Sequence, residues 1–275
     1  MPLFRRSDGT LVKDIPATRR IMPFLMKTRT SAAVYFEQTI DVTQAMRFLE
    51  ARGDLLPRAS FFHVFSWAAV RTLAERPRLN RFTSGVHTYQ RSAIELAFSA
   101  KKKMSDDAPL SVVKRAFDPA ASFEEHVAKL TGGIAEGRST EASSTDRELS
   151  IFLRLPAFLL RICVSLALWL DSVNLLPAAL TKDDPLYCSV FIANLGSVGL
   201  DAAYHHLYEW GNCPIFAAIG RVRETAEGRK ICTVRYTFDE RIEDGLYCAR
   251  ALQLLQQTIE TWEDAPASGV TALAS

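Results

Sequence analysis

The chain has 275 residues and the composition of a globular protein, with 48% hydrophobic and 23% charged residues. This length suits one large domain or two small ones, and it is long enough to bury a sizeable core. A formal net charge of +2 gives no global field toward nucleic acid, so we expect no nucleic-acid partner.

The five cysteines show neither a CxxC spacing nor an even-numbered framework. This pattern favours buried thiols in a reducing compartment. The N-terminal residues Met1–Arg6 lack the long apolar core of a signal peptide. We therefore expect a cytoplasmic protein.

Apolar periodicity predicts a chain that mixes strands and helices. Runs rich in β-branched and aromatic residues predict strands at 32–42, 93–99, 110–116, 190–194, 214–221 and 231–238. Helical spacing predicts helices at 60–75, 123–134 and 244–262, and a further helix that begins at 41–43. Ser122 and Glu125 form a capping-box pattern at one start. Residues 137–146 read as a polar loop, and 265–275 as a disordered tail.

The segment from Ile151 to Asp171 is apolar on nearly every helical face. Arg154, Pro156 and Arg161 interrupt it, so a membrane-spanning helix is not expected. A helix that is apolar all round must be covered. We expect an interface helix that packs on a neighbouring subunit. A substrate-tunnel lid and docking on a membrane surface are the alternatives.

The stretch Phe238–Gly245, with the sequence FDERIEDG, resembles the Asp-His-Arg-x-x-Asp-Gly signature of the dihydrolipoamide acyltransferases and chloramphenicol acetyltransferases. Three earlier segments resemble that family in the same order. They are Arg19–Met22, Phe62–Asn80 with its Pro-x-Leu-Asn end, and Phe191–Gly199 with its Asn-Leu-Gly turn. The resemblance covers roughly residues 15–264, apart from an insertion at about 139–184.

The resemblance implies an α/β fold of the chloramphenicol acetyltransferase type, a mixed sheet flanked by helices with an apolar helical insertion. It implies a single catalytic domain over 1–264, a homotrimer, and coenzyme A or an acyl-CoA as the ligand. An acyl carrier or the subunits of a larger complex are the further partners it implies. Nothing in the chain resembles a lipoyl domain.

The resemblance also assigns roles to single positions, and two of them are altered. The family base is a histidine, and Glu240 stands there. The family hydroxyl that binds the oxyanion is replaced by Ala193. Arg19 is expected to pair with Asp244. Gly245 should supply a tight turn, and Asn194 belongs to the turn that supports the site. Glu240 could act as a base only if desolvation raised its pKa; an ordinary paired glutamate is the alternative.

The segment His205-His206-Leu207-Tyr208-Glu209 is a candidate for relocated chemistry. On a helix, Glu209 would share a face with His205 and with His206. A His–Glu pair is the arrangement of a base and its orienting carboxylate. The alternatives are an aromatic interface turn with structural histidines, and two ligands of a metal site. Because no third ligand suggests itself, we expect no metal.

Two functions of different classes follow. The first is acyl transfer from coenzyme A or another thioester by a stand-alone relative of the acyltransferase core. The second is a catalytically silent trimeric scaffold or regulatory subunit. The changes at Glu240 and Ala193 favour the scaffold, whereas the histidine segment favours a changed enzyme.

Overall fold

The computed structural model describes residues 5–101, 110–138 and 152–262. Its strands are β1 (Gly9–Leu11), β2 (Ala33–Asp41), β3 (Arg81–Ser84), β4 (His87–Arg91), β5 (Ile94–Lys101), β6 (Leu110–Phe117), β7 (Val190–Asn194), β8 (Ile215–Glu224) and β9 (Lys230–Asp239). Its α-helices are α1 (Ala17–Arg20), α2 (Met22–Leu25), α3 (Thr43–Ala51), α4 (Phe61–Glu75), α5 (Phe123–Gly137), α7 (Ala157–Ser172), α8 (Ala178–Thr181) and α9 (Gly245–Glu260).

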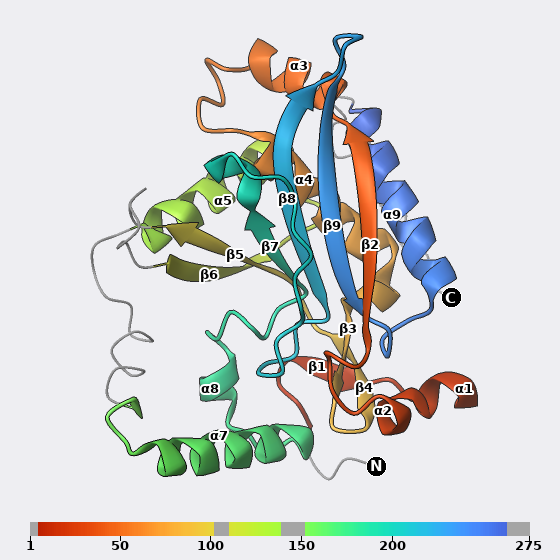
Figure 1. Ribbon diagram of the computed structural model, residues 1–275, viewed down its shortest axis with the longest axis vertical. Coiled ribbons are helices and arrows are strands. Elements are labelled where there is room, and N and C mark those ends of the chain that lie inside the picture. Colours follow the sequence, from red (N-terminus) through yellow and green to blue (C-terminus); the bar gives the residue numbers. More distant parts are fainter. Residues whose placement is uncertain (1–4, 102–109, 139–151, 263–275) are drawn as a thin grey trace.

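The larger of two sheets has the strand order β2-β9-β8-β7-β5-β6. Strand β7 runs parallel to both of its neighbours, and the remaining pairs are antiparallel. Helices α4, α5 and α9 cover one face of this sheet (Figure 1). The expected mixed sheet flanked by helices is therefore confirmed.

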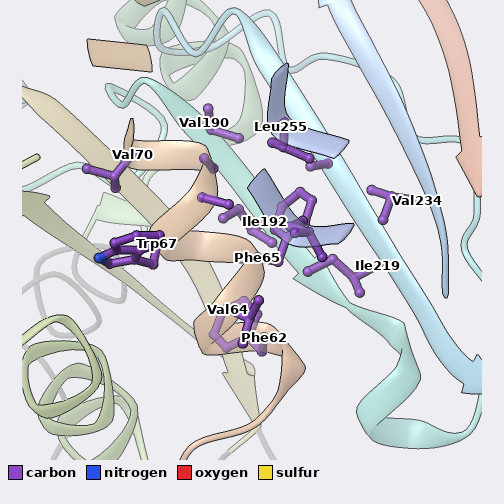
Figure 2. Close-up of a cluster of buried hydrophobic side chains, with 14 of the residues drawn as sticks. Phe62, Val64, Phe65, Trp67, Val70, Val190, Ile192, Ile219, Val234 and Leu255 are labelled. Atoms are coloured by element: carbon purple, nitrogen blue, oxygen red, sulfur yellow. The ribbon is translucent and has the colours of Figure 1, made fainter. Parts of the chain in front are cut away.

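Helix α4 forms the centre of the main core. Twelve of its fifteen residues are buried. Figure 2 shows Phe62 and Phe65 of α4 facing side chains of β7 and β8, among them Ile192 and Ile219. Full burial of one such side chain contributes about 1.5–3 kcal/mol. Leu255 of α9 belongs to the same cluster.

The opposite face of the sheet carries a second, smaller cluster. Along β7, Val190 and Ile192 belong to the main core, while Phe191 between them belongs to the second cluster. This alternation is the period of two of a strand that is covered on both faces. The coil between β7 and β8 covers this face with Ala202 and Leu207.

Two buried histidines hold α4 to its surroundings. His63 accepts a hydrogen bond at Nδ1 from the backbone N–H of Ser60 (3.2 Å) and so completes the helix cap. His126 of α5 lies 2.8 Å through Nε2 from the hydroxyl of Ser66. Burial lowers the pKa of His63 to about 4 and that of His126 to about 3. Both imidazoles are therefore neutral structural groups at physiological pH.

A second sheet was not anticipated from the sequence. Strands β1, β4 and β3 form it, with β4 in the centre. Gly85, at the β3–β4 turn, has φ +56°, and a Cβ there would lie 2.5 Å from the carbonyl oxygen of Ser172. A side chain at this turn would therefore displace the end of α7. The polar residues 139–146 and the tail 265–275 lie outside the described residues.

Helix α7 lies along one end of the molecule, away from the six-stranded sheet (Figure 1). Asp171 is its single buried residue. That carboxylate pairs with Arg6 (2.9 Å) and accepts a hydrogen bond from the hydroxyl of Ser84 (3.0 Å). The helix is thus fixed at its C-terminal end, while its apolar side chains are exposed or half-buried. None of the helices among the described residues is long and apolar enough to cross a membrane.

Candidate functional site

The backbone conformation of the turn after β7 depends on particular residue types. The side chain of Asn194 accepts a hydrogen bond from the N–H of Ser197 (3.2 Å), and the Ser197 hydroxyl donates to the Asn194 carbonyl (2.7 Å). Gly199 closes the turn at φ +77°. A Cβ on Gly196 would lie 2.5 Å from the carbonyl oxygen of Gly220. Asn194 and the two glycines therefore set the shape of this turn.

Ala193, expected from the resemblance at the position of the family hydroxyl, immediately precedes this turn. It pairs with Ala218 of β8 and packs against the smaller cluster, so its side chain belongs to the coil-covered face. The nearby hydroxyls do not replace the missing one. Ser189 is fully buried and accepts a hydrogen bond from the N–H of Glu95 (2.9 Å), and Ser197 is used within the turn.

The loop from β9 to α9 is built on a buried ion pair. Arg241 donates from Nε and Nη2 to the two carboxylate oxygens of Asp239, at 2.8 and 2.7 Å. Glu243, also buried, lies near the guanidinium groups of Arg81 (3.4 Å) and Arg78 (3.5 Å). Bidentate arginine–carboxylate pairs are short and geometrically specific, so the loop has a defined shape.

Glu240, expected from the resemblance at the position of the family base, is half-buried within this loop. Its N–H donates to the carbonyl of Ala32 (2.9 Å), and its carbonyl accepts a hydrogen bond from Nη2 of Arg19. The hydrogen bonds that hold Glu240 to the rest of the described chain thus run through its backbone. These two backbone hydrogen bonds fix the position of Glu240 in the loop.

The expected ion pair between Arg19 and Asp244 is not formed among the described residues. Asp244 instead caps α9, where its carboxylate accepts a hydrogen bond from the N–H of Tyr247 (2.9 Å). The first N–H groups of a helix lack partners in the helix and attract a carboxylate. The expected tight turn at Gly245 is also not required, because Gly245 begins α9 and an added Cβ would meet nothing within 4 Å.

Arg19 and Asp244 nevertheless line one cleft of about 310 Å³ beside the Glu240 loop. Arg78, Arg81 and Glu243 line it too, together with Asp14. Nε of Arg19 is buried and has no hydrogen-bond partner in the described part of the chain. The cleft therefore combines several guanidinium groups with the carboxylates of Asp14, Glu243 and Asp244.

The histidine segment is a coil on the face of the sheet to which Ala193 belongs. Nδ1 of His205 lies 2.7 Å from the carbonyl oxygen of His206. The His205 ring stacks on Phe216 of β8, with centroids 3.9 Å apart and planes at 5°. Burial lowers the pKa of His205 below its ordinary value. The His206 side chain is exposed.

Glu209 does not orient either histidine in this structure. Its carboxylate accepts hydrogen bonds from the N–H and hydroxyl of Thr30 (2.9 and 2.7 Å) and from the N–H of Arg29 (3.1 Å). Burial tends to raise its pKa, but the hydrogen bonds from Thr30 and Arg29 outweigh it, so the pKa is lowered. The shared helical face does not arise because the segment is not helical.

Arg29 was missed by the sequence reasoning. Its guanidinium is buried and donates to the carbonyl of Glu209 (2.7 Å), so it fixes the end of the histidine segment. A single arginine in a polar run gives no sequence signal for this role. Among the described residues, no group of three or more His, Cys, Asp or Glu side chains could hold a metal ion.

No protein-family model matches this sequence, and no curated protein matches it significantly. Solved structures do match. A probable dihydrolipoamide acetyltransferase from Listeria monocytogenes 4b F2365 is 14% identical with a TM-score of 0.60, covering 96% of this chain and 99% of that one. A truncated catalytic core of the 2-oxoacid dehydrogenase multienzyme complex from Thermoplasma acidophilum is 17% identical with a TM-score of 0.59 (90% and 97%). A chloramphenicol acetyltransferase is 12% identical with a TM-score of 0.58 (92% and 98%). The expected chloramphenicol acetyltransferase-like fold is thereby confirmed.

Proposed function

We propose that this protein is an acyltransferase that uses an acyl-CoA or another acyl thioester as donor, with His205 as the general base. The fold supports acyl transfer, because acetyltransferase structures share it over nearly their whole length. Within this fold, the chain builds both the Asn-Leu-Gly turn and the Asp-Gly loop. At the two altered positions the chain offers a carboxylate, Glu240, and a methyl group, Ala193.

The hydrogen bond between Nδ1 of His205 and the His206 carbonyl carries the proposal. A carbonyl oxygen only accepts, so Nδ1 bears the proton and Nε2 has a free lone pair. The lowered pKa keeps this imidazole neutral at physiological pH. Neutral Nε2 is the form of histidine that accepts a proton from a thiol or hydroxyl. The backbone carbonyl takes the orienting role that was expected of Glu209.

The reaction that follows is acyl transfer in two steps. Nε2 of His205 takes the proton from the acceptor thiol or hydroxyl, whose sulfur or oxygen attacks the thioester carbonyl carbon. When the carbon–sulfur bond of the thioester breaks, the leaving thiolate takes the proton back from the imidazolium. The products are the acylated acceptor and the free thiol of the donor.

The cleft beside Glu240 is the proposed site for an anionic part of the donor. Arg19, Arg78 and Arg81 line it, alongside the carboxylates of Asp14, Glu243 and Asp244. Arginine binds phosphate through charge-assisted hydrogen bonds. These residues would hold the phosphates of an acyl-CoA.

Separate substitutions test the base. Release of coenzyme A from an acyl-CoA is measured with thiol, hydroxyl and amine acceptors. His205→Gln should lower kcat/KM by about 10²–10⁴, whereas the exposed neighbour His206→Gln is the matched control. The wild-type rate should fall as the pH is lowered through the pKa of His205, because protonated Nε2 is no base. Unchanged rates in both variants would exclude the histidine segment as the base.

The second candidate is a catalytically silent scaffold, which the absence of an imidazole at Glu240 and of a hydroxyl at Ala193 favours. A calorimetric titration with coenzyme A separates the two functions. Binding without turnover on any acceptor would favour a regulatory subunit that keeps the ligand. Neither binding nor turnover would favour the pure scaffold.

We further propose a homotrimer with the Glu240 loop at the subunit boundary, and an acyl carrier or a larger complex as partner. The similarity to a core of a multienzyme complex supports an oligomeric subunit. Light scattering at micromolar concentration should give three times the chain mass of 30.7 kDa. A monomer would overturn the trimer.

A further inference from the structure

Helix α7 presents an apolar face to solvent. Phe158, Ile162, Leu166 and Trp169 are 63%, 58%, 52% and 57% exposed. Their spacing of four, four and three residues places them along one side of the helix. Large apolar side chains that are exposed together on one side of a helix mark a site of interaction.

The charges beside this face have one sign. Arg154 and Arg161 are exposed, and from Phe152 to Lys182 the sole carboxylate is that of Asp171. Asp171 is buried against Arg6 and so does not offset the two arginines at the surface. A helix that combines aromatic and aliphatic residues with arginine suits an anionic lipid surface.

The same charges disfavour pairing of α7 with its own copy. In a pair of such faces, the guanidinium groups of Arg154 and Arg161 would find no exposed carboxylate on the second α7, because its one carboxylate, Asp171, is buried. Burying a charge without a partner is costly. An occupant with negative charge satisfies both the apolar and the cationic side chains.

The placement of α7 leaves its face accessible. The helix is fixed at its C-terminal end by Asp171 and extends along one end of the molecule (Figure 1). Helix α2 lies at the same end (Figure 1) and exposes Phe24 (53%) and Leu25 (70%). Lys27, two residues after the end of this helix, is exposed as well. This end of the protein is therefore both apolar and cationic over two separate elements.

We propose that α7 docks on an anionic membrane surface, lying in the plane of the headgroups rather than crossing the bilayer. The helix has sixteen residues, and a spanning helix needs about 20. The apolar side chains would enter the headgroup–acyl boundary, while the guanidinium groups of Arg154 and Arg161 contact lipid phosphates. This interaction is independent of acyl transfer.

Vesicle flotation with the full chain tests the electrostatic part. The protein should bind phosphatidylcholine vesicles that contain phosphatidylglycerol and bind much less to phosphatidylcholine alone. The double variant Arg154→Gln/Arg161→Gln should lower the partition coefficient about 30-fold, since each basic residue near an anionic surface is worth about a factor of five. Equal binding to both kinds of vesicle, or to neither, would overturn the proposal.

The apolar part is tested with Ile162→Asp and Leu166→Asp, each of which should abolish flotation. The matched control is Leu55→Asp, at a residue that is 76% exposed and comes soon after α3 in the chain. Helix α3 lies at the opposite end of the molecule from α7 (Figure 1). The control should float like the wild type, and all variants should keep the wild-type melting temperature. If the α7 variants float normally but change the mass measured by light scattering, the face is an interface with a second copy and the proposal fails.

Discussion

Helices α4 and α7 have similar length and similar apolar content but opposite surroundings. Apolar residues occupy ten of the fifteen positions in α4 and twelve of the sixteen in α7. Twelve residues of α4 are buried, whereas Asp171 alone is buried in α7. Apolarity thus predicts that a helix will be covered, but it does not say by what.

The difference arises from what each helix faces. Helix α4 packs on the six-stranded sheet and against α5 and α9, and each of these supplies apolar side chains. Helix α7 meets the body through a polar network at one end, where Arg6, Ser84 and Asp171 join. Burial of the apolar side chains of α4 therefore stabilises the fold of this chain. Burial of the apolar side chains of α7 would instead stabilise its binding to another surface.

Acidification should affect the α4 region most. The folded pKa values of His63 and His126, about 4 and about 3, lie below the ordinary value of 6.5. The unfolded chain therefore binds more protons, and stability that is full above pH 6.5 is lost as the pH falls toward the folded values. At pH 4 the loss is about 3 kcal/mol for each histidine. Urea unfolding between pH 7 and 4 measures it, and His126→Gln should reduce the slope.

Removal of one aromatic side chain from α4 is the next largest effect. Phe65 is 1% exposed and stacks on Tyr236 of β9 at 6.3 Å. Phe65→Ala should lower the free energy of unfolding by about 3–5 kcal/mol, because it leaves a cavity between helix and sheet. Chemical denaturation provides the value. A loss below 1 kcal/mol would mean that the core around α4 is loosely packed.

The attachment of α7 should contribute less. Asp171→Ala removes a charged acceptor from Arg6, which keeps its pairing with Asp8 (2.8 Å). We expect a loss of about 2 kcal/mol, together with faster amide exchange in α7. Exchange that stays unchanged in α7 would show that contacts other than this network hold the helix.

The smallest effect is expected on the exposed face of α7. Phe158→Ala should change the stability of the isolated chain by no more than about 0.5 kcal/mol, because Phe158 is 63% exposed. The melting temperature is the measurement, with Phe65→Ala as the contrasting variant. A loss comparable to that of Phe65→Ala would show that α7 is covered by this protein itself, in another copy.

Local patterns predicted most elements of the main sheet and its helices. The capping box of Ser122 and Glu125 is formed as expected, with Ser122 accepting from the N–H of Glu125 (3.2 Å). Such signals act between residues that are close in sequence, so a single segment contains them. The sheet of β1, β3 and β4 was not predicted, because its strands are only three to five residues long. Strands β3 and β4 form a short hairpin, whereas β1 pairs with β4 far along the chain, Gly9 opposite Arg91.

The candidate site was predicted less completely. The sequence identified Asn194, Ala193 and Glu240 as positions of interest, but the partners of Arg19, Asp244 and Glu209 were assigned differently by the fold. Asp244 accepts a hydrogen bond at the N-terminus of α9, and Glu209 accepts one from the backbone N–H of Thr30. A carboxylate binds an unpaired donor that lies close to it in space. The spacing of residues in the sequence does not give that distance.

The sequence by itself determined the α/β class of this protein, the alternation of its strands and the start of α4, and it predicted two altered positions in an acyl-transfer site. Only the tertiary structure decided that His205 lies on the sheet face shared with Ala193, with Nδ1 bound to a carbonyl. It also decided that α7 is left exposed at one end. The reason is that periodicity and capping are local, whereas burial and hydrogen-bond partners depend on which segments meet after folding.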